Sequence, residues 1–165
     1  MTRPEGELTH LNERGEARMV DVTGKDVTTR SATARSRITI SPEVARLLQT
    51  GGLPKGDALA VARIAAIQAT KRTPDLIPLC HPIAVHGVDV DVAVVDGPDG
   101  PYVEILATVR TADRTGVEME ALTAAAVGGL TVIDMVKSRD RTAAIAEVVL
   151  LEKLGGRSGH WVRES

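Results

Sequence analysis

The chain is poor in aromatic residues. Only 1% of its 165 residues are aromatic, phenylalanine is missing, and Tyr102 and Trp161 are the single tyrosine and tryptophan. The core must therefore consist of valine, leucine, isoleucine and alanine, for which the apolar content of 43% is sufficient. Proteins that recognise single-stranded nucleic acid stack bases on aromatic side chains, so this composition argues against nucleic-acid binding.

Cysteine, net charge and long apolar runs are also scarce. The single cysteine, Cys80, excludes an internal disulfide framework and points to a reducing compartment. A net charge of −2 argues against non-specific attraction to nucleic acid or an anionic membrane. The N-terminal residues lack the apolar region of a secretion signal, and the most apolar run, 121–136, contains Asp134 and falls short of a membrane span. We therefore expect a soluble, cytoplasmic protein.

The patterns along the chain predict mixed strands and helices. Alternating side chains at 28–40 predict a half-buried strand, and valine-rich strands are expected at 85–95 and 144–154, with another strand at 102–110. A helix should follow Ser41, an N-cap residue, and a second should start at 54–57, with Ala60, Ile64 and Ile67 as its apolar stripe. The proline-rich segment 71–82 is expected to be a stiff, non-helical loop.

This order of elements predicts an α+β fold of the ferredoxin-like (split βαβ) type, with an antiparallel sheet and helices on one face. Residues 1–17 are polar and are expected to be flexible, which leaves 18–165 as a single catalytic domain. The valine-rich strands are expected to bury the other face of the sheet against a second subunit. We therefore expect an oligomer.

One long helix, from about 117 to 138, is the element around which the rest is organised. Its alanines and glycines at 124–129 would let another helix or a sheet approach closely. Asp134 and Lys137 are three residues apart and share a helix face, so they can touch. Glu120 and Asp134 lie ~21 Å apart along the axis. If both ends carry chemistry, the second end must come from another subunit or serve a second function.

The cations Lys55 and, in the next helix, Lys71 and Arg72 can each be interpreted in two ways. Lys55 lies in a turn between proline and glycine, and is either an exposed loop lysine or a lysine held rigidly enough to transfer protons near neutral pH. Lys71 and Arg72 end the second helix, where they either offset the helix dipole or present positive charge to a phosphate.

Cys80 and His81 lie between two prolines that fix the backbone. With one cysteine and four histidines in the chain, no spacing fits a closed metal site, so we expect no metal. Adjacent residues seldom point at each other, which argues against a nucleophilic Cys–His pair. We expect His81 to donate a hydrogen bond to a phosphate or a base edge.

The acids of the long helix also have two interpretations. Glu118 and Glu120 are either ordinary first-turn acids or, with Met119 between them, groups that bind the edge of an amino-pyrimidine. Asp134 either forms an exposed ion pair or, in its apolar register, is a buried acid that would be costly without a task. Together the candidates suggest acid–base work on a small anionic molecule.

Three separated motifs add a resemblance to a known family. The segments MVDVTGK (19–25), PKGD (54–57) with ARIAAIQATKRTPDLIPLCHP (62–82), and RTGVEMEALTAAAVGGLTVIDMVKS (114–138) resemble the cyclic pyranopterin monophosphate synthase (MoaC) family of molybdenum-cofactor biosynthesis. The resemblance implies a ferredoxin-like lyase without a cofactor, assembled as a homohexamer of three dimers with the active site at the dimer interface. Its substrate would be the triphosphate 3′,8-cyclo-7,8-dihydro-GTP, supplied by a radical-SAM enzyme, and pyrophosphate would be released.

The resemblance also implies roles for particular residues. The catalytic residues would be Asp134, Lys55 and Lys137, with the lysines as acid and base and Asp134 orienting Lys137. The substrate-binding residues would be Leu79, Cys80, His81, Met119, Glu120 and Glu118, with Arg30 and Lys71 as cations on the phosphate side. The rival interpretations are a non-catalytic nucleotide sensor or scaffold and, less consistent with the composition, an RNA-binding module.

Overall fold

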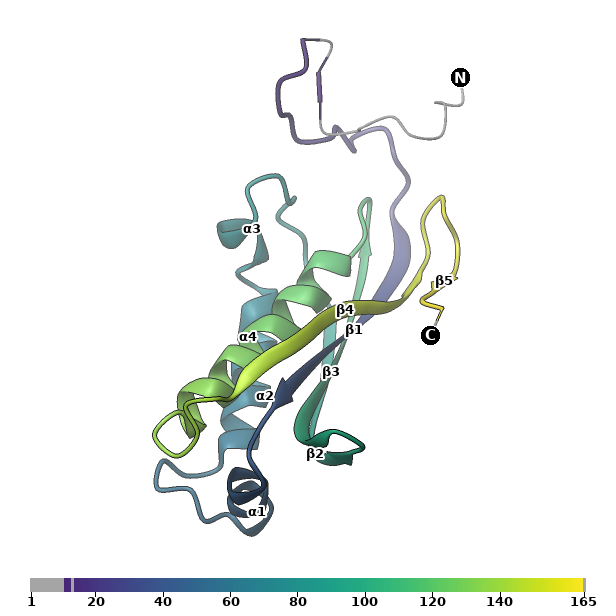
Figure 1. Ribbon diagram of the computed structural model, residues 1–165. Helices are drawn as coiled ribbons and strands as arrows, with labels where there is room; N and C mark the ends of the chain where they lie inside the picture. The colour runs from purple at the N-terminus through teal and green to yellow at the C-terminus, as the bar shows by residue number, and fades with distance from the viewer. Residues whose placement is uncertain (1–10, 13, 165) are drawn as a thin grey trace.

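The computed structural model describes residues 11–12 and 14–164 and shows an α+β fold (Figure 1). In chain order, the elements are β1 (Thr28–Thr39), α1 (Pro42–Thr50), α2 (Ala58–Thr70), α3 (Thr73–Leu76), β2 (Gly87–Gly97), β3 (Gly100–Asp113), α4 (Glu118–Val136), β4 (Ala144–Leu154) and β5 (Trp161–Val162). The strands form an antiparallel sheet in the order β2-β3-β1-β4-β5. The predicted α+β class is confirmed. Of the segment expected to be flexible, residues 1–10 and 13 lie outside the described residues.

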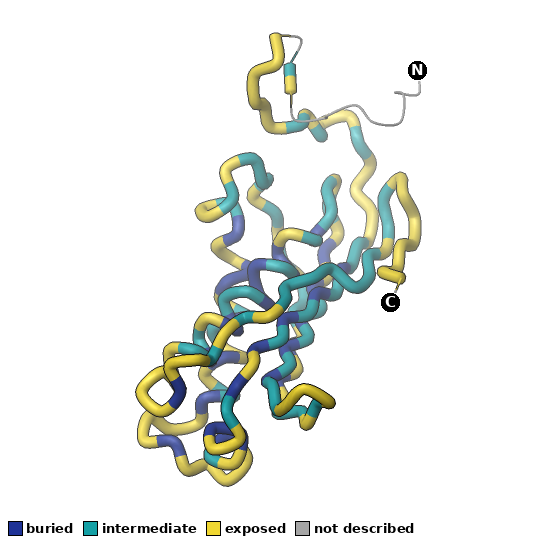
Figure 2. The backbone as a smooth tube through the Cα atoms, in the orientation of Figure 1, coloured by how far each residue is buried: buried dark blue, intermediate teal, exposed yellow. Residues whose placement is uncertain are grey.

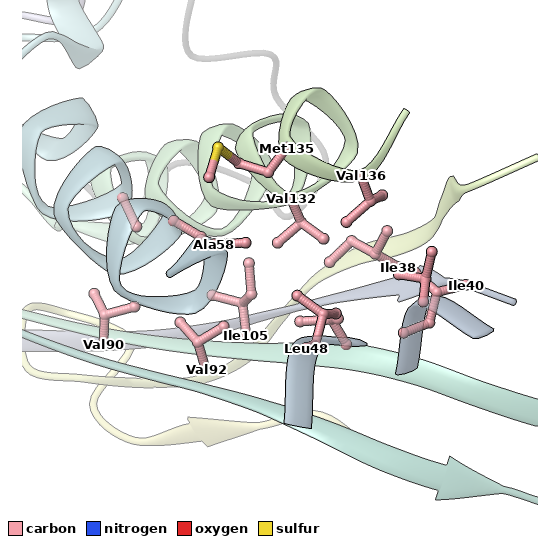
Figure 3. Packing of buried hydrophobic residues seen from close by; sticks show 14 of the residues in the cluster. Ile38, Ile40, Leu48, Ala58, Val90, Val92, Ile105, Val132, Met135 and Val136 are labelled. Atoms are coloured by element: carbon pink, nitrogen blue, oxygen red, sulfur yellow. The ribbon is translucent and has the colours of Figure 1, made fainter. Parts of the chain in front are cut away.

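The two longer helices, α2 and α4, pack side by side on one face of the sheet (Figure 1). α4 contacts β1, β3 and β4, while α2 contacts β2 and α4. The main core lies between the helices and the sheet. Figure 3 shows Ile105 of β3 pointing toward the helices and Val132 and Val136 of α4 pointing toward the sheet. The dark blue of buried residues accordingly follows α4 and the strands beside it (Figure 2).

The glycines of α4 allow the close approach that the sequence predicts. A Cβ atom on Gly128 would lie 2.9 Å from Cδ1 of Ile105 and 3.4 Å from Cβ of Ala66 in α2. A Cβ atom on Gly129 would lie 3.0 Å from the buried hydroxyl of Ser36 in β1. Since real Cβ atoms seldom come this close to their neighbours, α4 lies nearer to the sheet than larger residues would permit.

The same close packing overturns part of the expected stripe of α2, although Ile67 packs against the core as expected. Ile64 is 59% exposed, and the buried side chains of the helix are Ala58, Ala62, Ala66, Ala69 and Thr70. The expected stripe placed the largest apolar residues toward the core. Because α2 lies against the glycine-rich side of α4, the contact favours alanine, and Ile64 is left on the outer surface of the helix layer.

The valine-rich strands direct several of their apolar side chains toward the helices. Val90 and Val92 of β2 belong to the core beneath the helices, and Ile145 of β4 packs against it. The opposite face carries ion pairs instead. Arg35 in β1 lies 2.7 Å from Glu147 in β4, and the pairs Arg37–Glu104 and Arg110–Asp89 lie nearby on neighbouring strands. Side chains alternate between faces along a strand, and Val90 and Val92 fall on the helix side. The expected burial of the opposite face against a second subunit stays a prediction.

Two helices differ from their predicted form. The proline-rich segment contains one helical turn, α3, because Pro74 falls near the helix start, where a proline is tolerated. α4 is long and apolar enough by length and composition to cross a membrane, whereas the sequence argument placed it short of a span. Half of that stretch is buried against the sheet and α2, as expected of a core helix.

Candidate active site

Three predicted catalytic residues meet at the C-terminal end of α4. The Nζ of Lys137 lies 2.7 Å from Oδ1 of Asp134, one helical turn away. The Nζ of Lys55 donates to the backbone carbonyl of Asp134 at 2.8 Å and lies 3.6 Å from Oδ2 of the same residue. We call these three residues the lysine–aspartate cluster. Two ammonium groups thus converge on one carboxylate, and Lys55 comes from a segment 79 residues away from Asp134.

Asp134 is exposed, so one part of the sequence argument for it was wrong. Its side chain is 59% exposed, although its neighbours in the sequence suggested a buried register. The hydrogen bond from Lys137, together with the charges of Lys137 and Lys55, lowers the pKa of Asp134 below its ordinary value of 3.8. The carboxylate is therefore ionised across the physiological range, with a cation on either side that can exchange protons with a bound molecule.

Local structure explains how Lys55 reaches this cluster. α1 ends at Gly51, whose φ of 69° is the left-handed conformation that stops a helix, and Gly52 donates its backbone N–H to the carbonyl of Leu47. Leu53 is buried in the core, while Asp57 accepts a hydrogen bond from the backbone of Ala60 and caps α2. The turn that carries Lys55 is therefore anchored at both ends.

Six of the eight predicted substrate-binding residues meet at the opposite end of α4. They line a cavity of ≈ 340 Å³ and are Leu79, Cys80, His81, Glu118, Met119 and Glu120. The wall is completed by Thr115 and Gly116 and, from the segment before β1, by Val20, Val22 and Lys25. The cavity combines apolar surface with carboxyl, thiol, imidazole and ammonium groups. Such a combination suits a flat, polar heterocycle.

Glu120 is the buried acid of this cavity. Only 3% of the residue is exposed, and burial raises the pKa of Glu120 to about 7, a change to which the charge of Glu118 adds. Glu118 itself is bound by the Nζ of Lys153 at 2.8 Å, which ties α4 to β4. A carboxyl with a pKa near neutrality can both accept and donate a proton at the pH of a cell.

Cys80 and His81 are fixed by this environment. Burial, and then the charge of Glu120, raise the pKa of the Cys80 thiol. The Nε2 of His81 lies 2.7 Å from the backbone carbonyl of Val20. Because a carbonyl only accepts, Nε2 must carry the proton, and the imidazole offers Nδ1 to a ligand. His81 can therefore donate a hydrogen bond to a phosphate, as expected, only when both ring nitrogens are protonated.

Arg30 and Lys71 lie outside both groups. Arg30 donates from Nε to the carbonyl of Asp113 at 3.0 Å, and it lines a separate cavity of ≈ 280 Å³ with Arg157 and Lys25. Lys25 lines both cavities and so connects them. Lys71 is exposed at the C-terminal cap of α2. Its predicted role at a phosphate stays a prediction.

Two residues that the structure places at these groups, Lys25 and Lys153, were not predicted from the sequence. Lys25 belongs to the MVDVTGK segment, which was noted only for its resemblance. Lys153 contacts Glu118, which is 35 residues away in the sequence, and no local pattern identifies such a partner. Among the residues that the structure describes, no group of three or more His, Cys, Asp or Glu side chains could hold a metal ion.

The two groups of residues lie ~21 Å apart, since 14 residues of helix separate Glu120 from Asp134. The structure therefore shows two separate groups of candidate residues, one at each end of α4. We call each group a partial site. One partial site offers a carboxylate between two ammonium groups. The other offers a polar cavity with a near-neutral carboxyl.

Comparison with known proteins places the chain in one family. Residues 19–156 match the model of the MoaC family. A protein of Streptomyces avermitilis named cyclic pyranopterin monophosphate synthase is 62% identical over 94% of this chain and 89% of its own length. Proteins of the same name from Streptomyces coelicolor and Thermomicrobium roseum are 59% and 56% identical, over 97% and 96% of this chain and 92% and 94% of their own lengths. On this match, which spans both partial sites, the chain belongs to the MoaC family.

Proposed function

We propose that this chain is a cyclic pyranopterin monophosphate synthase of molybdenum-cofactor biosynthesis. It would convert 3′,8-cyclo-7,8-dihydro-GTP into cyclic pyranopterin monophosphate and release pyrophosphate, acting as a lyase. The observation that carries the proposal is the lysine–aspartate cluster, in which Lys55 and Lys137 both contact Asp134. A protein that only senses a nucleotide needs no pair of lysines on one carboxylate, so this geometry favours catalysis over the rival scaffold.

The roles divide between the two ends of α4. The cavity at the N-terminal end would bind the heterocycle, with Glu120 facing its ring N–H and amino groups and Met119 giving apolar contact. The lysine–aspartate cluster would transfer protons during the ring rearrangement. His81 and the cations Arg30 and Lys71 would hold the triphosphate and stabilise the departing pyrophosphate.

A complete site would require a second copy of the chain. The two partial sites are ~21 Å apart in one chain, which is too far for one substrate to touch both. A second copy would bring its own cluster to the cavity of the first. The helix layer supports this arrangement, because Val61, Ile64 and Leu130 are exposed there to 42%, 59% and 59%. Large apolar side chains on one surface are typical of an interface.

Several finer features belong to the same proposal. The strand order β4-β1-β3-β2 and the sequence of elements support a ferredoxin-like fold. The assembly would be a homohexamer of three dimers located in the cytoplasm, and a radical-SAM enzyme would supply the substrate. Residues 18–165 would form the single catalytic domain.

The test is direct turnover. The purified protein is incubated with 3′,8-cyclo-7,8-dihydro-GTP, pyrophosphate is quantified, and the pterin product is oxidised and detected by fluorescence. We expect Lys55→Ala and Lys137→Ala to abolish turnover while the fold and the assembly stay intact. Arg46→Ala, which removes an exposed cation of α1, is the control and should keep wild-type turnover. A lysine variant with near-normal turnover would remove that lysine from the mechanism.

A further inference from the structure

A buried carboxylate links the two segments that carry the catalytic lysines. Asp140 lies in the loop between α4 and β4, three residues after Lys137, and is only 5% exposed. Its Oδ1 accepts hydrogen bonds from the backbone N–H and the hydroxyl of Thr142, at 2.9 and 2.6 Å. Its Oδ2 accepts from the backbone N–H of Ser41 at 2.6 Å. The carboxylate therefore joins its own loop to the start of α1.

This link connects the two halves of the lysine–aspartate cluster. Ser41 is the N-cap of α1, and α1 leads directly into the turn that carries Lys55. On the other side, the backbone N–H of Asp140 donates to the carbonyl of Val136, the last residue of α4. Figure 1 shows α1 and the loop after α4 at the same end of the molecule. A shift between these two segments would change the contact of Lys55 with Asp134.

We propose that Asp140 is a positioning residue, which holds α1 and the end of α4 in the register that places Lys55 on Asp134. The inference rests on the proposed function of the cluster. Burial tends to raise the pKa of Asp140, but the hydrogen bonds from Thr142 and Ser41 outweigh it and lower the pKa below 3.8. The carboxylate thus remains charged, and charged acceptors form the stronger hydrogen bonds.

Asp140→Asn separates the two contacts of the carboxylate, the turn formed with Thr142 and the link to Ser41. With its oxygen toward Thr142, the amide keeps the turn, but its NH2 group then faces the N–H of Ser41, where two donors repel. Thr142→Val is the matched control, because it removes a hydrogen bond from the same carboxylate and leaves the link to Ser41. If Asp140→Asn does not fold, Asp140→Glu takes its place, since it keeps the charge and displaces the carboxylate by one methylene.

Two measurements test the proposal. In the turnover assay, we expect Asp140→Asn to lower kcat about tenfold and to leave KM within about twofold, because misplaced positioning groups cost activity at this scale. NMR of the lysine ammonium groups at pH 6 measures their order parameters. The order parameter of the Lys55 ammonium group should fall in Asp140→Asn. The order parameter of the Lys153 ammonium group, which is paired with Glu118 at the other end of α4, should stay unchanged.

The outcomes separate this proposal from the proposed function. Wild-type order at Lys55 in Asp140→Asn overturns the positioning role, as does an equal loss of order at Lys153, which would indicate general loosening. An equal loss of turnover in Thr142→Val also overturns it. If the wild-type protein shows no turnover, the proposed function fails, and the order of Lys55 alone decides whether Asp140 positions the cluster.

Discussion

Glu120 makes the stability of the protein depend on pH in an unusual direction. A buried carboxyl whose pKa is raised to about 7 binds a proton in the folded chain at pH values where the unfolded chain, with a pKa near 4.5, has lost it. The folded state thus binds more protons between these two values. The contribution of Glu120 to stability is therefore lost as the pH rises from about 4.5 to about 7, opposite to the usual behaviour of an acid.

The magnitude follows from the two pKa values. A pKa of about 7 in place of 4.5 corresponds to about 3 kcal/mol at 298 K. The carboxyl lines an open cavity that water can enter, so we reduce this to about 2 kcal/mol. Glu120→Gln resembles the protonated acid at every pH. We expect it to be about 2 kcal/mol more stable than the wild type at pH 8 and similar to it at pH 4.5.

Urea unfolding at pH 5, 6, 7 and 8 and at one protein concentration measures this difference directly. Glu43→Gln, which changes an exposed acid in the first turn of α1, is the control and should differ from wild type by the same amount at each pH. A 13C NMR titration of the Glu120 carboxyl should have its midpoint near 7. A stability difference for Glu120→Gln that is equal at pH 5 and pH 8, or a midpoint near 4.5, would refute the reasoning.

Three further perturbations test neighbouring parts of the structure. Gly129→Val should lower the free energy of unfolding by about 1–3 kcal/mol in urea, because its side chain would enter the contact between α4 and the sheet; an unchanged value would contradict the close packing. Lys153→Met leaves Glu118 without its cation, and since the charge of Glu118 raises the pKa of Glu120, the NMR midpoint of Glu120 should rise further. Cys80, the only thiol of the chain, should react with iodoacetamide faster at pH 8 in Glu120→Gln than in the wild type, because the charge of Glu120 raises the thiol pKa. Equal rates would show that the two groups do not interact.

Much of the fold could be read from local patterns. The spacing of apolar residues located α4 to within two residues at each end, and the Ser41 N-cap marked the start of α1. Small residues in α4 predicted a close approach of other elements, and the glycine contacts confirm it. These features depend on neighbours in sequence or on one helix face, so a pattern of a few residues is sufficient to identify them.

Features that depend on partners distant in sequence could not be read in this way. Ile64 resembles a core residue, yet it is exposed because α2 meets the glycines of α4. Asp134 resembles a buried acid but lies on the surface. The contact between Lys55 and Asp134 joins two segments that are 79 residues apart and meet only in the folded chain, and the resemblance to a family, rather than any spacing, indicated that they belong together.

The sequence alone therefore determined the longer helices and strands, the α+β class and the residue types available for chemistry, because these follow from periodicity and composition. Tertiary packing determined which of those residues meet. It placed one set of side chains in a cavity at the start of α4 and the lysine–aspartate cluster at its end. It also set the raised pKa of Glu120, because burial depends on what the folded chain lays over a side chain and not on the residues beside it.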